Sequence, residues 1–72
     1  MPNHPNRTRR GSSAARPAPE RIRHAREAAG LSQEAAAERV LSTRRTWQDW
    51  EAGVARMHPG LWRLFLIETS QV

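Results

Sequence analysis

Four polar side chains within one short segment have the types and spacing of a nucleic-acid contact surface. At about 100° per residue, a helix through this segment places them on one side; they are Arg44, Arg45, Gln48 and Asp49. Arginine is the bidentate donor that matches the O6 and N7 atoms of guanine. The chemistry predicted for this surface is therefore hydrogen bonding to base edges.

The two arginines stand where an ordinary helix does not favour them. Arg44 and Arg45 would lie in the first turn, and cations there oppose the helix dipole. An anionic ligand offsets that cost, which favours DNA contact over the alternative, a solvated first turn. Asp49 would either accept a hydrogen bond from cytosine N4 or orient Arg45 one turn earlier, and we favour the orienting role.

Four helices are expected to position this surface. Ser32 and Thr43 have the hydroxyl side chains of helix N-caps, whereas Gly30 and Gly53 are suited to the position after a helix. The expected helices span residues 19–29, 33–40, 44–52 and 59–68, and no strand pattern is present. The fold class is therefore all-α, a compact four-helix domain over residues 19–72.

Composition narrows the partner and excludes several classes of site. The 72-residue chain carries a formal charge of +5, and all 12 of its basic residues are arginine, which makes a polyanion the default partner. There is no cysteine, and the three histidines (His4, His24 and His58) lack metal-ligand spacing. We expect no enzymatic activity, no metal, no cofactor, no small-molecule effector and no membrane span, in a protein of the cytoplasm.

The charge is concentrated at the N-terminus. Residues 1–18 hold four arginines and no acid, a charge of +4, whereas the remainder holds eight arginines against seven acids, a charge of +1. Residues 1–18 contain too few apolar residues to form a core, so we expect a flexible, basic arm. Arg7, Arg9 and Arg10 would contact phosphates without regard to sequence or enter an adjacent minor groove, and we favour phosphate contact.

The segment around the predicted contact surface resembles the Xre/lambdoid-repressor family of helix-turn-helix DNA-binding proteins. The resemblance covers about residues 22–53 and rests on Leu31-Ser32-Gln33, Ala37, Thr43-Arg44-Arg45-Thr46 and Glu51-Ala52-Gly53. It is also similar to small regulators of phages and mobile elements, including those that accompany anti-CRISPR genes. Membership of this family would imply a helix-turn-helix domain whose partner is double-stranded DNA.

The resemblance assigns roles to single residues. It implies base contacts by Arg44, Arg45 and Asp49, with Gln48 on the same side. It implies phosphate contacts by Gln33 and Thr43 at the starts of two helices. It also implies a partly buried ion pair between Arg26 and Glu51.

The chain departs from the family pattern in the turn and in the core. Leu41 and Ser42 replace the usual glycine and small apolar residue of the turn, which leaves the path of the turn open. Ala36 replaces an inward leucine, while Trp47 and Trp50 replace inward aliphatic residues. A gain of volume on one helix then compensates for a loss on the other. Base stacking is the alternative role for the tryptophans, and we favour the core.

A single clear helix, 59–68, follows Gly53, and it is apolar almost all round. Leu61, Leu64 and Phe65 share one face, while Trp62 and Leu66 lie about 100° away. We expect the second face to form a homodimer interface with Trp62 and Leu66 at its centre. The alternative is that the C-terminal tail or the 54–58 loop covers it.

These features together predict a bacterial, sequence-specific transcriptional regulator that acts as a dimeric repressor or autorepressor on a palindromic operator. The alternative is an antitoxin whose main partner is a toxin, with DNA binding secondary. A third class, a peptide that coats nucleic acid without sequence preference, would use the arm and the helix arginines alike.

Overall fold

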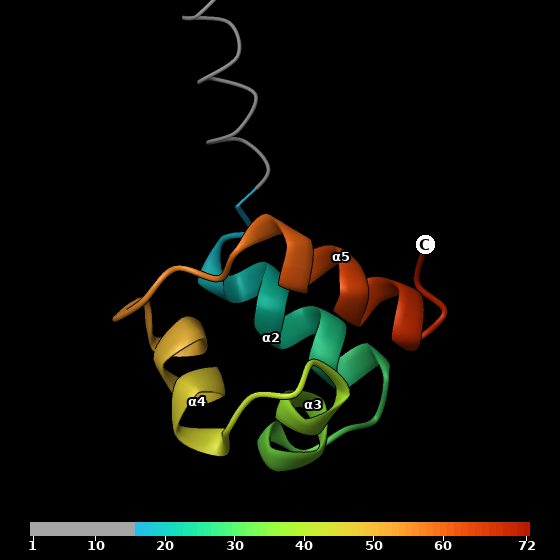
Figure 1. The fold of residues 1–72 in the computed structure, drawn as a ribbon, viewed down its shortest axis with the longest axis horizontal. Coiled ribbons are helices and arrows are strands. Elements are labelled where there is room, and N and C mark those ends of the chain that lie inside the picture. The colour runs from blue at the N-terminus through green and yellow to red at the C-terminus, as the bar shows by residue number, and fades with distance from the viewer. Residues whose placement is uncertain (1–15) are drawn as a thin grey trace, which may run out of the picture.

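The computed structural model describes residues 16–72, which fold into four helices (Figure 1). These are α2 (Pro19–Ala28), α3 (Gln33–Arg39), α4 (Arg44–Ala52) and α5 (Pro59–Glu68). No strand occurs among the described residues, so the predicted all-α class is confirmed. The predicted ranges agree with the observed helices to within one residue at each end. Arg7, Arg9 and Arg10 lie outside the described residues.

Three of the four helices begin at a side-chain cap, whereas α2 begins with Pro19 and has none. The Ser32 hydroxyl accepts a hydrogen bond from the Ala35 amide at 3.1 Å, and the Thr43 hydroxyl accepts one from the Thr46 amide at 3.2 Å. His58 caps α5 through Nδ1, which accepts from the Gly60 amide at 2.8 Å. Each cap satisfies an amide that the first turn leaves without a partner, and together they fix where α3, α4 and α5 start.

The turn between α3 and α4 uses a left-handed residue that is not glycine. Leu41 has φ +58°, and its amide donates to the Glu38 carbonyl at 3.1 Å. The Ser42 amide donates to the Ala37 carbonyl at 2.9 Å, which completes the hydrogen-bond pattern usually formed by a C-terminal glycine. The backbone of the turn therefore adopts the conformation that is usual for glycine, although the residue at this position is leucine.

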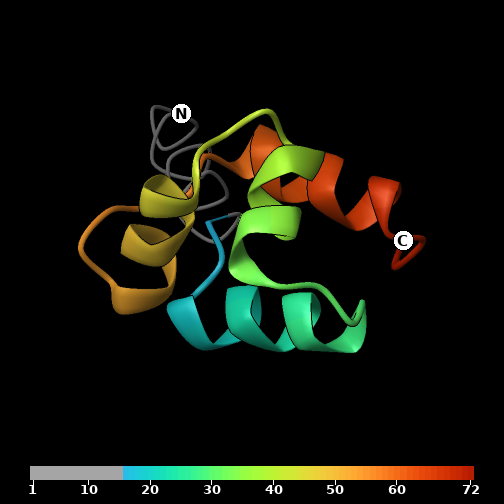
Figure 2. The same ribbon diagram turned by 90° about the horizontal axis from the view of Figure 1, so that it is seen from below.

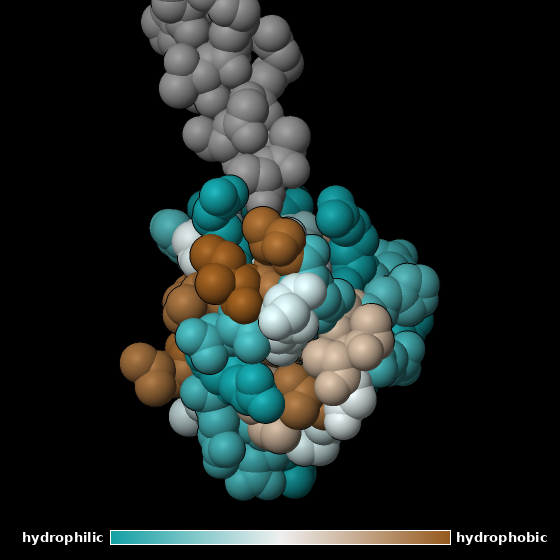
Figure 3. Space-filling view, turned by 90° about the vertical axis from the view of Figure 1, so that its right-hand side faces the viewer, coloured by the Kyte–Doolittle hydropathy of each residue, from teal (hydrophilic) through white to brown (hydrophobic). Residues whose placement is uncertain are grey.

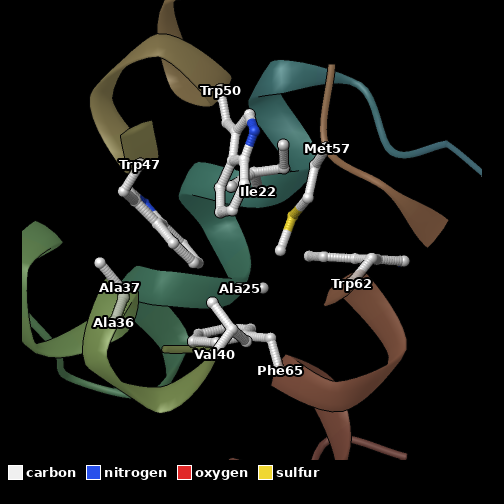
Figure 4. Packing of buried hydrophobic residues seen from close by; sticks show 10 residues of the cluster. All are labelled: Ile22, Ala25, Ala36, Ala37, Val40, Trp47, Trp50, Met57, Trp62 and Phe65. Atoms are coloured by element: carbon white, nitrogen blue, oxygen red, sulfur yellow. The ribbon is translucent and has the colours of Figure 1, made fainter. Parts of the chain in front are cut away.

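The core contains buried side chains from all four helices, and the Trp47 ring points into it from α4 (Figure 4). The Trp47 ring lies 4.9 Å from Phe65 and 5.5 Å from Trp50, between ring centroids. Trp47 is completely buried, as are Ala36 and Ala37 of α3. The prediction that the tryptophans are core residues rather than a stacking platform is confirmed.

Two further core residues, Met57 and Trp62, differ from what the sequence predicted. Met57, in the loop before α5, is fully buried, although the sequence pattern had not marked it. Trp62 is 9% exposed and stacks on Phe65 at 6.5 Å, with the Arg21 guanidinium 5.7 Å above its ring. The expectation that Trp62 lies on a free face is therefore corrected, because its own chain covers it.

The arrangement of helices exposes one side of α4. Figure 1 and Figure 2 both show α4 at one end of the molecule, where it packs against α2 and α3. The chain after α5 folds back on the first helix, since the Gln71 side-chain amide donates to the Ala25 carbonyl at 3.0 Å. At the opposite end from α4, hydrophobic side chains lie among hydrophilic ones on the surface (Figure 3).

Candidate nucleic-acid interface

The exposed side of α4 carries the four residues that the spacing placed together, and we call it the reading face: Arg44, Arg45, Gln48 and Asp49. Arg44 and Arg45 are exposed, with 83% of the Arg45 side chain accessible, whereas the other two are half-buried. Trp47 and Trp50 lie on the opposite, buried side of the helix. The helix is thus anchored by its aromatic side, and two guanidinium groups project from its start.

Arg45 and Asp49 lie one helical turn apart on the reading face. The Arg45 Nε and Asp49 Oδ1 atoms are 3.6 Å apart, and 32% of the Asp49 side chain is exposed. This separation fits a loose ion pair rather than a close hydrogen bond, and exposed pairs of this kind contribute little stability. The contact places the Asp49 carboxylate beside the Arg45 guanidinium.

The first turn of α4 contains no acidic residue to balance its arginines. The N-terminal end of a helix carries partial positive charge from its free amides, which the two guanidinium groups reinforce. The local field therefore attracts an anion at this end of α4.

Thr43 and Gln33, which the family resemblance assigns to phosphate contact, already form hydrogen bonds within the chain. The Thr43 hydroxyl, besides capping α4, donates to the Thr46 hydroxyl at 3.0 Å. Gln33 is half-buried at the start of α3, where its Nε2 donates to Glu51 Oε1 at 3.2 Å. Both residues lie near the start of a helix, but their polar groups also hold neighbouring elements in place.

Arg26 and Glu51 form the ion pair that ties α2 to α4. Arg26 Nε donates to Glu51 Oε2 at 2.6 Å, and a second guanidinium nitrogen donates to Oε1 at 3.2 Å. Arg26 also donates to the Leu31 carbonyl at 3.1 Å, so it braces the link between α2 and α3. Side-chain exposures are 16% for Arg26 and 8% for Glu51, which makes this a largely enclosed, bidentate pair.

The Glu51 carboxylate accepts hydrogen bonds from three different side chains. Besides Arg26 and Gln33, the Trp47 indole Nε1 donates to its Oε2 at 2.5 Å. Burial alone would raise the pKa of the Glu51 carboxyl, but the hydrogen bonds from Arg26, Trp47 and Gln33 and the charge of Arg26 outweigh it. The net effect lowers the Glu51 pKa, so the group is ionised in the folded protein at neutral pH.

Gln33 and Gln48 form a contact that the sequence did not predict. Gln48 Nε2 donates to Gln33 Oε1 at 3.2 Å, which links the reading face to the start of α3. The residues are 15 positions apart on different helices, so no local spacing signals the contact. By contrast, the Trp47–Glu51 contact joins residues one turn apart and follows from helical periodicity.

The loop after α4 adds a basic rim that the sequence patterns did not single out. A groove between the start of α2 and this loop has residues of both segments in its lining, among them Arg16, Trp50, Gly53 and Arg56. Both arginines are exposed. Positive charge therefore continues beyond the end of α4 toward the N-terminal side of the domain.

Two other features are absent from residues 16–72, a cluster that could bind a metal ion and a helix that could cross a membrane. That part of the chain holds no group of three or more His, Asp or Glu side chains placed to bind a metal ion. None of the helices described is long and apolar enough to cross a membrane.

Comparison with known proteins identifies the kind of domain. A family model described as a helix-turn-helix domain matches residues 20–66, a span that runs from the start of α2 into α5. No curated protein matches the chain. The α3, turn and α4 described above lie within the matched span.

Proposed function

The chain belongs to the family of helix-turn-helix domains, and from this premise we propose that it is a sequence-specific, DNA-binding transcriptional regulator. One observation carries the proposal. The two tryptophans of α4 are buried, while Arg44 and Arg45 are exposed together at the start of the same helix. A helix of that design can enter the major groove with its N-terminal arginines against base edges.

In this proposal each polar residue of α4 has a defined role. Arg44 and Arg45 would donate to guanine O6 and N7, each worth about 1–3 kcal/mol against a wrong base. Asp49 would restrict the orientation of Arg45, in keeping with their 3.6 Å separation. Thr43 and Gln33, at the starts of α4 and α3, would lie beside the phosphates.

The basic N-terminal segment supplies affinity without sequence preference in this proposal. Arg7, Arg9 and Arg10 would neutralise phosphates and release counterions, which makes binding depend strongly on salt. Arg56, exposed in the loop after α4, would act in the same way.

We also propose that the regulator acts as a dimeric repressor on a palindromic operator. The supporting observation is that α5 leaves Leu66 half-buried and Ile67 53% exposed on the surface, although Trp62 is enclosed. A symmetric pair would present two copies of α4 to half-sites about one helical turn apart. Occupation of such a site at a promoter would block transcription.

Selection of bound duplexes from a random DNA pool tests the proposal. We expect the wild-type protein to enrich a short motif that contains guanine, with two inverted half-sites. The Arg44→Ala variant should lose the preference for one guanine in each half-site, whereas Arg63→Ala, an exposed arginine on α5, should leave the base preferences within a half-site unchanged. Failure of the wild-type protein to enrich any motif would reject the proposed function, and a motif without symmetry would reject the dimer.

A further inference from the structure

A chain of hydrogen bonds runs from the buried ion pair to the reading face. Arg26 and Trp47 donate to the Glu51 carboxylate, and so does Nε2 of Gln33. The Oε1 atom of Gln33 in turn accepts from Nε2 of Gln48, with both amide contacts at 3.2 Å. The chain crosses from α4 to α3 and returns to α4.

The chemistry of each partner fixes the direction of this chain. An ionised carboxylate only accepts hydrogen bonds, so Gln33 must turn its amide nitrogen toward Glu51. The carbonyl oxygen of Gln33 then faces away, toward Gln48, and an oxygen of this kind also only accepts. Gln48 must therefore turn its own nitrogen inward. The lowered pKa of Glu51 keeps the first acceptor charged at neutral pH.

The orientation of the Gln48 amide leaves a defined set of atoms for a ligand. The side-chain hydrogen bond that Gln48 forms within residues 16–72 uses Nε2. No buried side-chain nitrogen or oxygen in that range lacks a partner, so the free Oε1 is not enclosed. The reading face thus offers an acceptor oxygen with one remaining N–H beside it, next to two arginines that offer only donors.

We propose that Gln48 contacts adenine in the major groove and that Gln33, held by Glu51, is a positioning residue for this contact. The inference rests on the proposed function. Adenine presents an N6 donor and an N7 acceptor, which complement the oxygen and the free N–H of Gln48. Guanine presents two acceptors there, and its O6 would face the Gln48 oxygen. The arginines and Gln48 would thus select different purines from one helix face.

Two variants separate positioning from simple phosphate contact. Gln48→Ala removes the proposed base contact, while Gln33→Met keeps the length of the Gln33 side chain and removes both amide hydrogen bonds. Glu38→Met, an exposed residue on the same helix as Gln33, is the matched control. Unfolding of each variant is followed to ensure that the folded protein is compared.

The readout is the base preference in motifs selected from random DNA by each protein. We expect a preference for adenine of about 10-fold or more at one base pair in the wild type. Gln48→Ala and Gln33→Met should each reduce it to about 3-fold or less at that same base pair, with the guanine preferences retained and Glu38→Met unchanged.

Two results would overturn the inference while leaving the proposed function intact. One is a Gln33→Met protein that binds every sequence more weakly but keeps the adenine preference, as a phosphate contact alone would require. The other is a Gln48→Ala protein with the wild-type motif. If the wild-type protein selects no motif, the proposed function itself fails.

Discussion

Arg26 and Glu51, 25 residues apart in the sequence, are joined by two hydrogen bonds that fasten α2 to α4. Glu51 lies one turn beyond Trp47 on α4 and accepts the indole N–H of that residue. The same carboxylate therefore connects the first helix, the aromatic core and Gln33 at the start of α3. Through Glu51, the helix that carries the reading face is linked to both α2 and α3.

Removal of one partner of the ion pair should destabilise the fold substantially. Arg26→Ala leaves the enclosed Glu51 carboxylate with only the donors of Trp47 and Gln33, so we expect a loss of about 2–3 kcal/mol in the free energy of unfolding. Urea denaturation measures it. Arg23→Ala, an exposed arginine on the same helix, serves as the control and should change stability by less than about 0.5 kcal/mol. Equal losses in the two variants would show that the ion pair contributes nothing specific.

Stability should also decline in acid through Glu51. The folded state lowers the pKa of this carboxyl below its ordinary value of 4.5, so the unfolded state takes up the proton first as the pH falls. The contribution of Glu51 is thus fully present above about pH 5 and is lost as the pH falls through its folded pKa. Thermal unfolding between pH 3 and pH 7 should show a steeper acid decline in the wild type than in Glu51→Gln. Parallel curves for the two proteins would contradict this assignment.

Leu41→Gly should stabilise the protein. Leu41 holds a left-handed conformation at φ +58° and is 93% exposed, so glycine removes backbone strain and sacrifices almost no packing. The greater freedom of glycine in the unfolded chain offsets part of the gain, which leaves a net stabilisation of about 0.5–1 kcal/mol. Leu41→Ala keeps the strain and is the control. If the Leu41→Gly protein is less stable than the Leu41→Ala protein, backbone strain at this position is not what limits stability.

The sizes of the buried side chains on α3 and α4 should have coupled effects on stability. Ala36→Leu overfills a fully buried site and should cost about 1–3 kcal/mol, and Trp47→Leu leaves a cavity and should cost about 3 kcal/mol. If large residues on α4 compensate for small ones on α3, the double variant loses less stability than the sum of the single losses. Additive losses, measured by chemical denaturation, would show that the two sites fill separate spaces.

Local signals account for the features that could be predicted from the sequence. Ser32, Thr43 and Gly53 mark helix ends by side-chain or backbone chemistry within a few residues, and the spacing of Trp47 and Trp50 marks the buried side of α4. Met57 was missed because it lies in a loop, where no periodicity shows which side chain enters the core. The enclosure of Trp62 depends on α2, whose Arg21 covers its ring, and the Gln33–Gln48 contact depends on how two helices cross.

The central claim is that α4 distinguishes one DNA sequence from another through its exposed arginines. The most direct test is the affinity of the wild type, Arg44→Ala and Arg63→Ala for the selected duplex and for a scrambled duplex, measured over a range of salt concentrations. The account predicts that Arg44→Ala loses about 1–3 kcal/mol on the selected duplex and much less on the scrambled one. Arg63→Ala, which leaves the reading face intact, should lose no more affinity on the selected duplex than on the scrambled one. Equal losses for Arg44→Ala on the two duplexes would contradict the claim and leave only sequence-independent attraction to the DNA backbone.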